Sequence, residues 1–235
     1  MRFQTDLVPA RLVRRYKRFL ADAILDSNGQ EVTVHCPNPG AMLGLAEAGS
    51  RIWLEPNDDP RKKLKFGWRL VELGDGHLAG IDTGVPNRVV KEALIAREIP
   101  ELGSYETIRP EVPYAEKSRV DFLLSDAQGR QTYVEVKNVH LRRVGSLAEF
   151  PDCVTKRGAR HLADLATMVE AGHRAVMIYL IQRTDCTEMD FARDIDPAYG
   201  EAFDEARARG VEAIAYATRI TRNEVIFGSQ IPIRI

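Results

Sequence analysis

The sequence has 235 residues and a mass of 26.4 kDa, with 44% hydrophobic and 29% charged residues, so it can bury a core without metal or disulfide support. Lys and Arg total 33 against 34 for Asp and Glu, a formal charge of -1. This balance excludes a highly basic nucleic-acid coat and a disordered acidic tail, so any polyanion site must be a local patch. The three cysteines, Cys36, Cys153 and Cys186, form no CxxC pair, which argues against a disulfide framework and a structural zinc site.

Neither a signal peptide nor a membrane span is expected. Charges interrupt every apolar stretch near the N-terminus, and the longest wholly apolar run covers only residues 175–181. A spanning helix needs about 20 apolar residues. We therefore expect a cytoplasmic protein without membrane contact.

The first third of the sequence alternates short strand-like segments with turn-rich ones. Strands are expected over residues 12–25, 31–35, 51–55 and 68–73. Their close spacing predicts a small β-barrel, with an oligonucleotide-binding (OB) fold as one candidate. His35 and Cys36 are adjacent but have no second ligand pair, so we expect a loop that closes the barrel rather than a metal site.

Gly and Pro at residues 81–86 mark a domain boundary, with one domain over 1–82 and a second over 83–235. The second domain is expected to have helices and strands in the order helix, three strands, helix, strand, helix, strand and a terminal hairpin. This order predicts an α/β fold with a mixed sheet flanked by helices. The segments are a helix over 86–98, strands over 106–114, 119–124 and 132–139, a helix over 155–171, a strand over 175–181, a helix from Asp196 to Gly210 and a strand over 211–220. A helix-turn-helix over 198–220 is a weaker alternative, because 211–220 is β-branched and alternating.

The most informative segment joins two of these strands. On the extended segment 132–139, Glu135 and Lys137 emerge on one face about 7 Å apart, while the valines beside them enter the core. If the preceding strand pairs with it, Asp121 comes near Glu135. Two carboxylates beside an ammonium suit phosphodiester hydrolysis with Mg²⁺, with Asp121 and Glu135 as metal ligands and Lys137 orienting water.

A plainer interpretation of this pattern stays open. A Glu-x-Lys pair on a strand is usually a solvated ion pair that contributes little. Glu92 on the preceding helix is a candidate fourth catalytic residue, but it can equally be a surface glutamate. Glu111 competes with it for that role.

Basic residues form local clusters that can bind phosphates. Arg157 and His161 share one face at the start of a helix, with Lys156 and Arg160 as a second basic pair; a solvated first turn is the alternative. Two further groups lie in the first domain. We expect Tyr16 and Phe19 to be core residues rather than base-stacking ones. The candidate DNA contacts are Arg14, Arg15, Lys17, Arg18, Lys62, Lys63, Lys65, Arg142, Arg143, Arg157 and His161.

Six blocks of the sequence occur in a familiar order: RRYKRFLAD, HCPNPGAM, DTGVPNRVVKEAL, SRVDFLL, EVKNV and FPDCVTKRGARHL. In this order and spacing the chain resembles the sugar fermentation stimulation protein family, SfsA. The resemblance implies an OB-fold barrel followed by a PD-(D/E)XK, restriction-endonuclease-like core. In that motif Asp121 is the first acid, Glu135 the second, Lys137 the lysine and Glu92 the helix acid. Departures from the expected pattern are Pro39 for Thr, Asp82 for Asn, Val120 for Pro and Cys153 for Ala.

The resemblance also implies sequence-nonspecific binding of double-stranded DNA and a regulatory role in maltose and sugar metabolism. We therefore predict a DNA-binding protein with a nuclease site that depends on Mg²⁺, with Mn²⁺ as a substitute. The alternative is a non-catalytic, DNA-binding transcriptional regulator on a nuclease scaffold. Assembly as a homodimer is left open.

Overall fold

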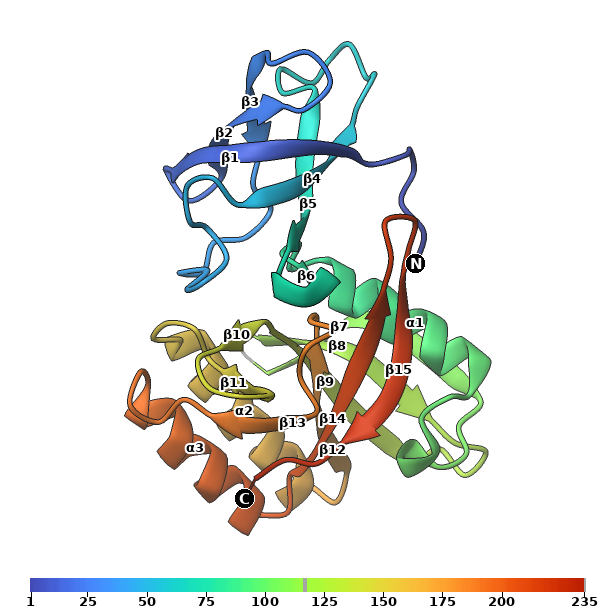
Figure 1. Cartoon of the computed structure of the whole chain (residues 1–235). Coiled ribbons are helices and arrows are strands. Elements are labelled where there is room, and N and C mark those ends of the chain that lie inside the picture. Colours follow the sequence, from blue (N-terminus) through green and yellow to red (C-terminus); the bar gives the residue numbers. More distant parts are fainter. Residues whose placement is uncertain (116–117, 235) are drawn as a thin grey trace.

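The N-terminal part of the chain forms a small β-barrel (Figure 1). In the computed structural model, which describes residues 1–115 and 118–234, the barrel sheet has the order β3-β2-β1-β4-β5-β6. A parallel bridge between His35 and Gly67 joins β3 to β5 and closes the barrel, as predicted. Alternating apolar side chains, among them Leu12, Leu54 and Trp68, fill its interior. The strands are β1 Val8–Tyr16, β2 Leu20–Leu25, β3 Glu31–His35, β4 Arg51–Pro56, β5 Phe66–Glu72 and β6 Leu78–Gly80, with a 3-10 turn, η1, at Gly74–Gly76.

The first barrel strand differs from its prediction. The expected single strand over 12–25 is a hairpin of β1 and β2, in which Tyr16 pairs with Leu20. The sequence does not reveal this turn, because Lys17 and Arg18 occupy left-handed backbone positions that usually carry Gly or Asn. Phe19 is 48% exposed, so its expected place in the core is wrong.

The second part of the chain is built on a mixed sheet with the order β15-β14-β12-β9-β8-β7. Strands β9, β12 and β14 are parallel to one another, and the other neighbouring pairs are antiparallel. This confirms the predicted α/β fold. Its elements are α1 Val85–Ala96, η2 Pro100–Leu102, β7 Thr107–Ala115, β8 Ser118–Ser125, β9 Gln131–Val139, β10 Leu141–Arg142, β11 Leu147–Phe150, α2 Lys156–Glu170, β12 Arg174–Ile181, β13 Glu188–Phe191, α3 Pro197–Ala208, β14 Glu212–Ile220 and β15 Val225–Ile231. The sequence analysis did not predict β10, β11 and β13, which form a small separate sheet.

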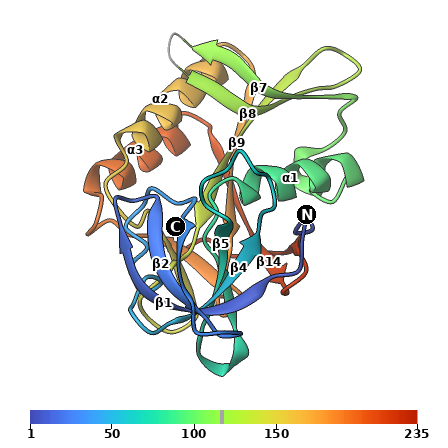
Figure 2. The same cartoon turned by 90° about the horizontal axis from the view of Figure 1, so that it is seen from above.

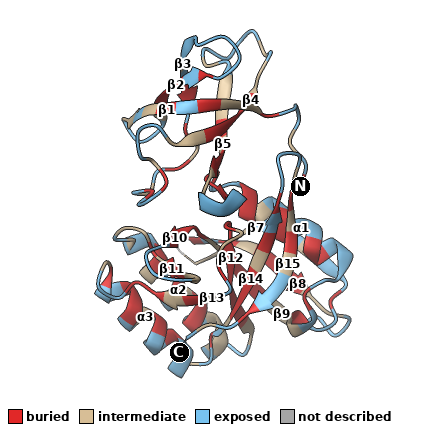
Figure 3. Ribbon diagram, in the orientation of Figure 1, coloured by how far each residue is buried: buried red, intermediate tan, exposed pale blue. Residues whose placement is uncertain are grey.

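Helices cover both faces of the mixed sheet, α1 on one and α2 with α3 on the other (Figures 1 and 2). Strand β12 shows the division: Val176 and Ile178 pack in the core under α1, while Met177 and Tyr179 pack in the core under α2 and α3. Burial on both sides explains why this strand is apolar at nearly every position (Figure 3).

The ends of the helices follow local rules. Asp196 accepts a hydrogen bond from the Tyr199 amide and Pro197 begins α3, as the sequence predicts. Thr155 caps α2 by accepting from the Gly158 amide. Because α3 is followed by strand β14, residues 198–220 are not a helix-turn-helix.

Hydrogen bonds join the barrel to the mixed-sheet domain. Gly80 of β6 donates to the Gln182 carbonyl at 2.8 Å, and the Met42 amide of a barrel loop donates to Asp152 Oδ2 at 2.9 Å. The last barrel strand ends at Gly80 and α1 begins at Val85, on either side of the boundary predicted after residue 82. Over the described ranges, no helix is long and apolar enough to cross a membrane.

Candidate active site

Two carboxylates meet where β8 and β9 diverge. The paired register ends at Phe122 opposite Val134, and its continuation places Asp121 opposite Glu135. Instead of backbone pairing at this point, Asp121 Oδ2 accepts from the Val136 amide at 2.7 Å. Its other oxygen accepts from Asn87 Nδ2 of α1 at 2.6 Å. The Asp121 carboxylate is therefore fixed by both the neighbouring strand and a helix.

Glu135 lies on the face of β9 that packs against α2, and it is 3% exposed. Its Oε1 accepts from Lys137 Nζ at 2.6 Å and from His161 Nδ1 of α2. Arg157 Nε donates to His161 Nε2 at 3.2 Å, which places the histidine proton on Nδ1. The second carboxylate oxygen, Oε2, is buried and has no hydrogen-bond partner among the described residues.

The two carboxylates differ in their electrostatic surroundings. Burial and the neighbouring Glu135 charge raise the pKa of Asp121 to about 6, against the hydrogen bonds from Val136 and Asn87. Burial also opposes ionisation of Glu135, but the hydrogen bond from His161 and the charge and hydrogen bond of Lys137 outweigh it and lower its pKa. Glu135 is therefore ionised more readily than a free glutamate, whereas Asp121 has a raised pKa of about 6.

This donor set fits a hard divalent cation. It offers carboxylate oxygens only, and the unpartnered Glu135 Oε2 is an acceptor in need of a positive partner. No group of three or more His, Cys, Asp or Glu residues suited to a metal occurs within 1–115 and 118–234. Mg²⁺ does not require one, because it is usually bound by one or two carboxylates together with waters and substrate phosphates. Asp121 and Glu135 are thus the residues that could hold it.

Glu92 does not join this site. Its carboxylate accepts from the amino group of Met1 at 2.5 Å, and its side chain is 59% exposed. The helix residue that contacts Asp121 is Asn87, five positions earlier and thus on a different face of α1. Glu111, the competing candidate, is exposed on β7. The sequence analysis missed Asn87 because an amide on a helix carries no catalytic signal by itself.

The predicted phosphate site at the start of α2 is also revised. His161 is 3% exposed and its ring is bound to Glu135, so it cannot contact a phosphate at the surface. It instead donates a hydrogen bond to the Glu135 carboxylate. Arg157, Lys156 and Arg160 are exposed along the same end of α2. The four-residue spacing of Arg157 and His161 was informative, but it indicated a hydrogen bond within the helix.

Several predicted DNA contacts have their charge compensated within the protein. Arg142 pairs with Asp185 at 2.5 Å, and Arg143 pairs with Glu149 and Asp194. Because these carboxylates already satisfy both guanidinium groups, the structure does not support their predicted role as phosphate contacts.

In the barrel, Arg14 pairs with Asp22, and Arg15 donates to the carbonyls of Asn38 and Gly40. Both arginines therefore hold parts of the barrel together. Among the predicted DNA contacts, those exposed without an ion pair to a described residue are Lys17, Arg18, Lys62, Lys63, Lys65 and Arg157. Lys62 and Lys63 line a cavity of about 550 Å³ beside the β4–β5 loop.

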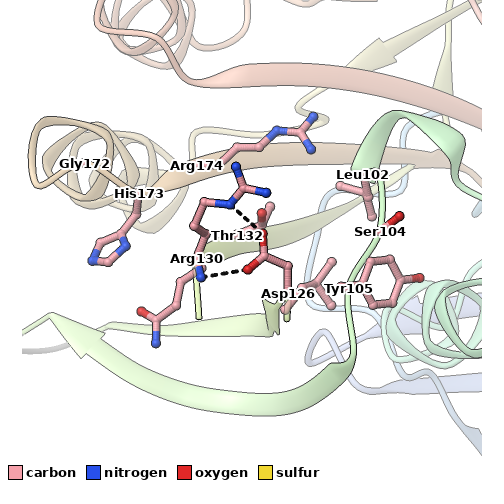
Figure 4. A pocket seen from close by; sticks show the side chains of 12 residues that line it. Leu102, Ser104, Tyr105, Asp126, Arg130, Thr132, Gly172, His173 and Arg174 are labelled. Carbon is pink, nitrogen blue, oxygen red and sulfur yellow. Dashed lines mark hydrogen bonds and ion pairs between the residues drawn. The ribbon is translucent and has the colours of Figure 1, made fainter. Parts of the chain in front are cut away.

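Another cavity, of about 430 Å³, lies at the opposite end of the mixed sheet, where β8 ends and β9 and β12 begin (Figure 4). Its most polar side chains are engaged: Arg130 pairs with Asp126, and Arg174 pairs with Glu212. It is lined by none of the residues around Asp121 and Glu135. The cavity is therefore separate from the carboxylate site.

Comparisons with known proteins agree with this architecture. Residues 13–81 match the SfsA N-terminal OB domain, and residues 84–224 match the sugar fermentation stimulation protein RE domain. The sugar fermentation stimulation protein homolog of Dinoroseobacter shibae is 67% identical over 99% of this chain and 96% of its own length. The homolog of Roseobacter denitrificans is 61% identical over the full length of both. SfsA of Pyrococcus furiosus, solved in complex with Ca²⁺, superposes with a TM-score of 0.89 at 25% identity, covering 100% of this chain and 98% of that one.

Proposed function

The chain belongs to the sugar fermentation stimulation protein family, and from this premise we propose that it is a sequence-nonspecific DNA-binding protein with a Mg²⁺-dependent phosphodiesterase site. The observation that carries the proposal is the pair of carboxylates, half-buried Asp121 and buried Glu135, beside the ammonium of Lys137. Placing two acids together away from water is unfavourable, and acids with pKa values shifted in this way cluster at functional sites.

Hydrogen bonds from the surrounding residues fix the orientation of both carboxylates. His161 and Lys137 bind the same oxygen of Glu135, which leaves the buried Oε2 without a hydrogen-bond partner among the described residues. Asn87 and the Val136 amide hold Asp121 in one orientation. Lys137, with a side chain 13% exposed, is placed to orient water or to stabilise charge on a phosphate.

We assign Asp121 and Glu135 as ligands of Mg²⁺, with Mn²⁺ as a substitute. A bound cation at this position would polarise a phosphate and lower the pKa of water. It would also favour the ionised form of Asp121, whose pKa of about 6 reflects burial and the nearby Glu135 charge. The Ca²⁺ complex of Pyrococcus furiosus SfsA supports divalent-cation binding in this family.

The exposed, uncompensated cations form the DNA surface in this proposal. Lys62, Lys63 and Lys65 lie on the β4–β5 loop, and Lys17 and Arg18 lie on the β1–β2 turn. Such side chains bind the phosphate backbone without reading base edges, which accounts for binding without sequence preference.

The direct test incubates supercoiled, linear and branched DNA with the full chain and Mg²⁺. We expect strand cleavage that EDTA stops and that Lys137→Ala reduces by at least about 100-fold. Arg130→Ala is the matched control, because the Arg130 side chain is 80% exposed and its partners among the described residues are Asp126 and Gln128, at the far end of the sheet. If the wild type leaves every substrate intact over a range of Mg²⁺ and Mn²⁺ concentrations, the catalytic proposal is refuted.

A second function fits one observation. The Lys137 ammonium already compensates the charge of Glu135, and the described residues bring only two acids together, so the site would place a metal without catalysis. The protein would then be a DNA-binding regulator of maltose and sugar metabolism on a nuclease scaffold. Salt-dependent DNA binding without cleavage, unaffected by Lys137→Ala, is the result expected for this function.

A further inference from the structure

The turn between β1 and β2 combines a strained backbone with large side chains. Lys17 and Arg18 have φ values of 48° and 62°, a region that Gly, Asn and Asp occupy most readily. Non-glycine residues keep such conformations only where the surroundings hold them, and these positions cluster at functional sites. Asn and Gly at these two positions would relieve the strain but would remove both cations.

Hydrogen bonds fix the backbone of this turn. The Lys17 carbonyl accepts from the Phe19 amide at 2.7 Å, and the Phe19 carbonyl accepts from the Cys36 amide at 2.9 Å. Arg15 Nε donates to the Arg18 carbonyl at 3.3 Å. The side chains nevertheless point outward: Phe19 is 48% exposed, and Lys17 and Arg18 are exposed with no ion pair to any described residue. An exposed aromatic ring thus directly follows two exposed cations on this turn.

Hydrogen bonds, joined by short stretches of backbone, connect the base of this turn to the carboxylate site. Arg15 Nη2 binds the Gly40 carbonyl at 2.8 Å, and two residues further on the Met42 amide binds Asp152. Asp152 also accepts from His140, which lies three residues beyond Lys137. Figure 1 shows this end of the hairpin on the same side of the molecule as β10 and α2. A DNA segment bound at the acidic pair would therefore extend toward this turn.

We infer that the turn formed by Lys17, Arg18 and Phe19 is a DNA wedge, in which the two cations bind phosphates and the Phe19 ring inserts between adjacent bases. Apolar side chains inserted in this way unstack a base step and bend the duplex. Unstacking costs least at mismatched or unpaired bases, so the preferred substrate class is DNA with a locally weakened duplex. This inference rests on the DNA binding proposed above and specifies its substrate.

The test uses the full chain with Ca²⁺ in place of Mg²⁺ and duplexes that carry 2-aminopurine, whose fluorescence rises when it is unstacked. We expect wild type to raise the fluorescence, and more strongly for a duplex with a mismatch beside the probe. Phe19→Ala should abolish the rise at saturation and weaken binding to the mismatched duplex by about 5- to 100-fold. Ile24→Ala is the matched control, because Ile24 is 39% exposed on β2 of the same hairpin.

A second variant separates the roles of charge and ring. Lys17→Asn together with Arg18→Gly keeps the left-handed turn, so we expect the logarithmic salt dependence of binding to fall by up to about 2 while the fluorescence rise at saturation persists. Binding by wild type without any fluorescence change, or a rise that survives Phe19→Ala, would overturn the wedge and leave the proposed function intact. No binding to any DNA would overturn both.

Discussion

The raised pKa of Asp121 predicts that the carboxylate site costs stability when no cation is bound. The pKa is about 6 in the folded chain, against about 3.9 in an unfolded chain. The folded state therefore holds this proton more tightly, so stability falls as pH rises from about 4 to 6 and stays lower above that range. At about 1.4 kcal/mol per pKa unit, the loss is about 3 kcal/mol.

Replacing Asp121 with Asn should recover most of this loss. The new amide can accept from the Val136 amide and donate to the Asn87 oxygen after Asn87 reverses its own amide, so both present hydrogen bonds keep counterparts. Allowing for burial of the amide, we expect Asp121→Asn to raise the free energy of unfolding by about 2 kcal/mol at pH 8 in EDTA. At pH 4 the difference should shrink below about 1 kcal/mol, because the wild-type carboxyl is then protonated.

Urea unfolding can be followed by circular dichroism, because the three α-helices of the described chain all lie in the mixed-sheet domain. Tryptophan fluorescence does not isolate the barrel: Trp68 lies in the barrel core, but Trp53 of β4 packs in the core that contains α1. The circular-dichroism transition of Asp121→Asn should therefore shift to higher urea concentration. Added Mg²⁺ or Ca²⁺ should stabilise the wild type and leave Asp121→Asn unchanged. A variant less stable than wild type at pH 8 without metal would refute the electrostatic reasoning.

Three further predictions concern other contacts. His161→Ala should weaken Mn²⁺ binding by about 10- to 100-fold in calorimetry, because the histidine orients Glu135. His161→Gln should restore part of the affinity. Equal Mn²⁺ affinities of the wild type and His161→Ala would contradict this role. Burial raises the pKa of the Asp152 carboxyl, but hydrogen bonds from His140, Met42 and Cys153 outweigh burial and hold this pKa at about 2. The stabilisation of the fold by Asp152 is therefore present above about pH 4 and is lost as the pH falls toward 2. Asp152→Ala should therefore destabilise the chain by about 2 to 3 kcal/mol at pH 7 in urea titrations, and an unchanged midpoint would argue against the contact. Lys62→Ala with Lys63→Ala should lower the salt dependence of DNA binding by up to about 2 without changing the Mn²⁺ affinity, and an unaltered slope would exclude this loop from the interface.

Local patterns in the sequence determined the elements of the fold. The alternation of β9 separates Val134 and Val136 from Glu135 and Lys137, because the side-chain period of a strand is two. The Asp196–Pro197 cap and the wholly apolar β12 likewise depend on neighbouring residues only. These features follow from backbone geometry and from the pattern of apolar residues, and a short stretch of sequence is enough to show each of them. The core of the candidate site, Asp121 with Glu135 and Lys137, followed from the same strand pattern.

Only the tertiary structure decided which other side chains reach the two acids. Helical spacing shows which residues share a face but not which face meets the sheet, so the sequence cannot show that Asn87, and not the candidate Glu92, contacts Asp121. His161 contacts Glu135, which lies 26 positions earlier in the chain, and Arg143 pairs with Asp194, which lies 51 positions later. Such pairings depend on how whole elements pack, because a charged or polar side chain takes the partner that packing brings nearest and not the role that its local sequence suggests.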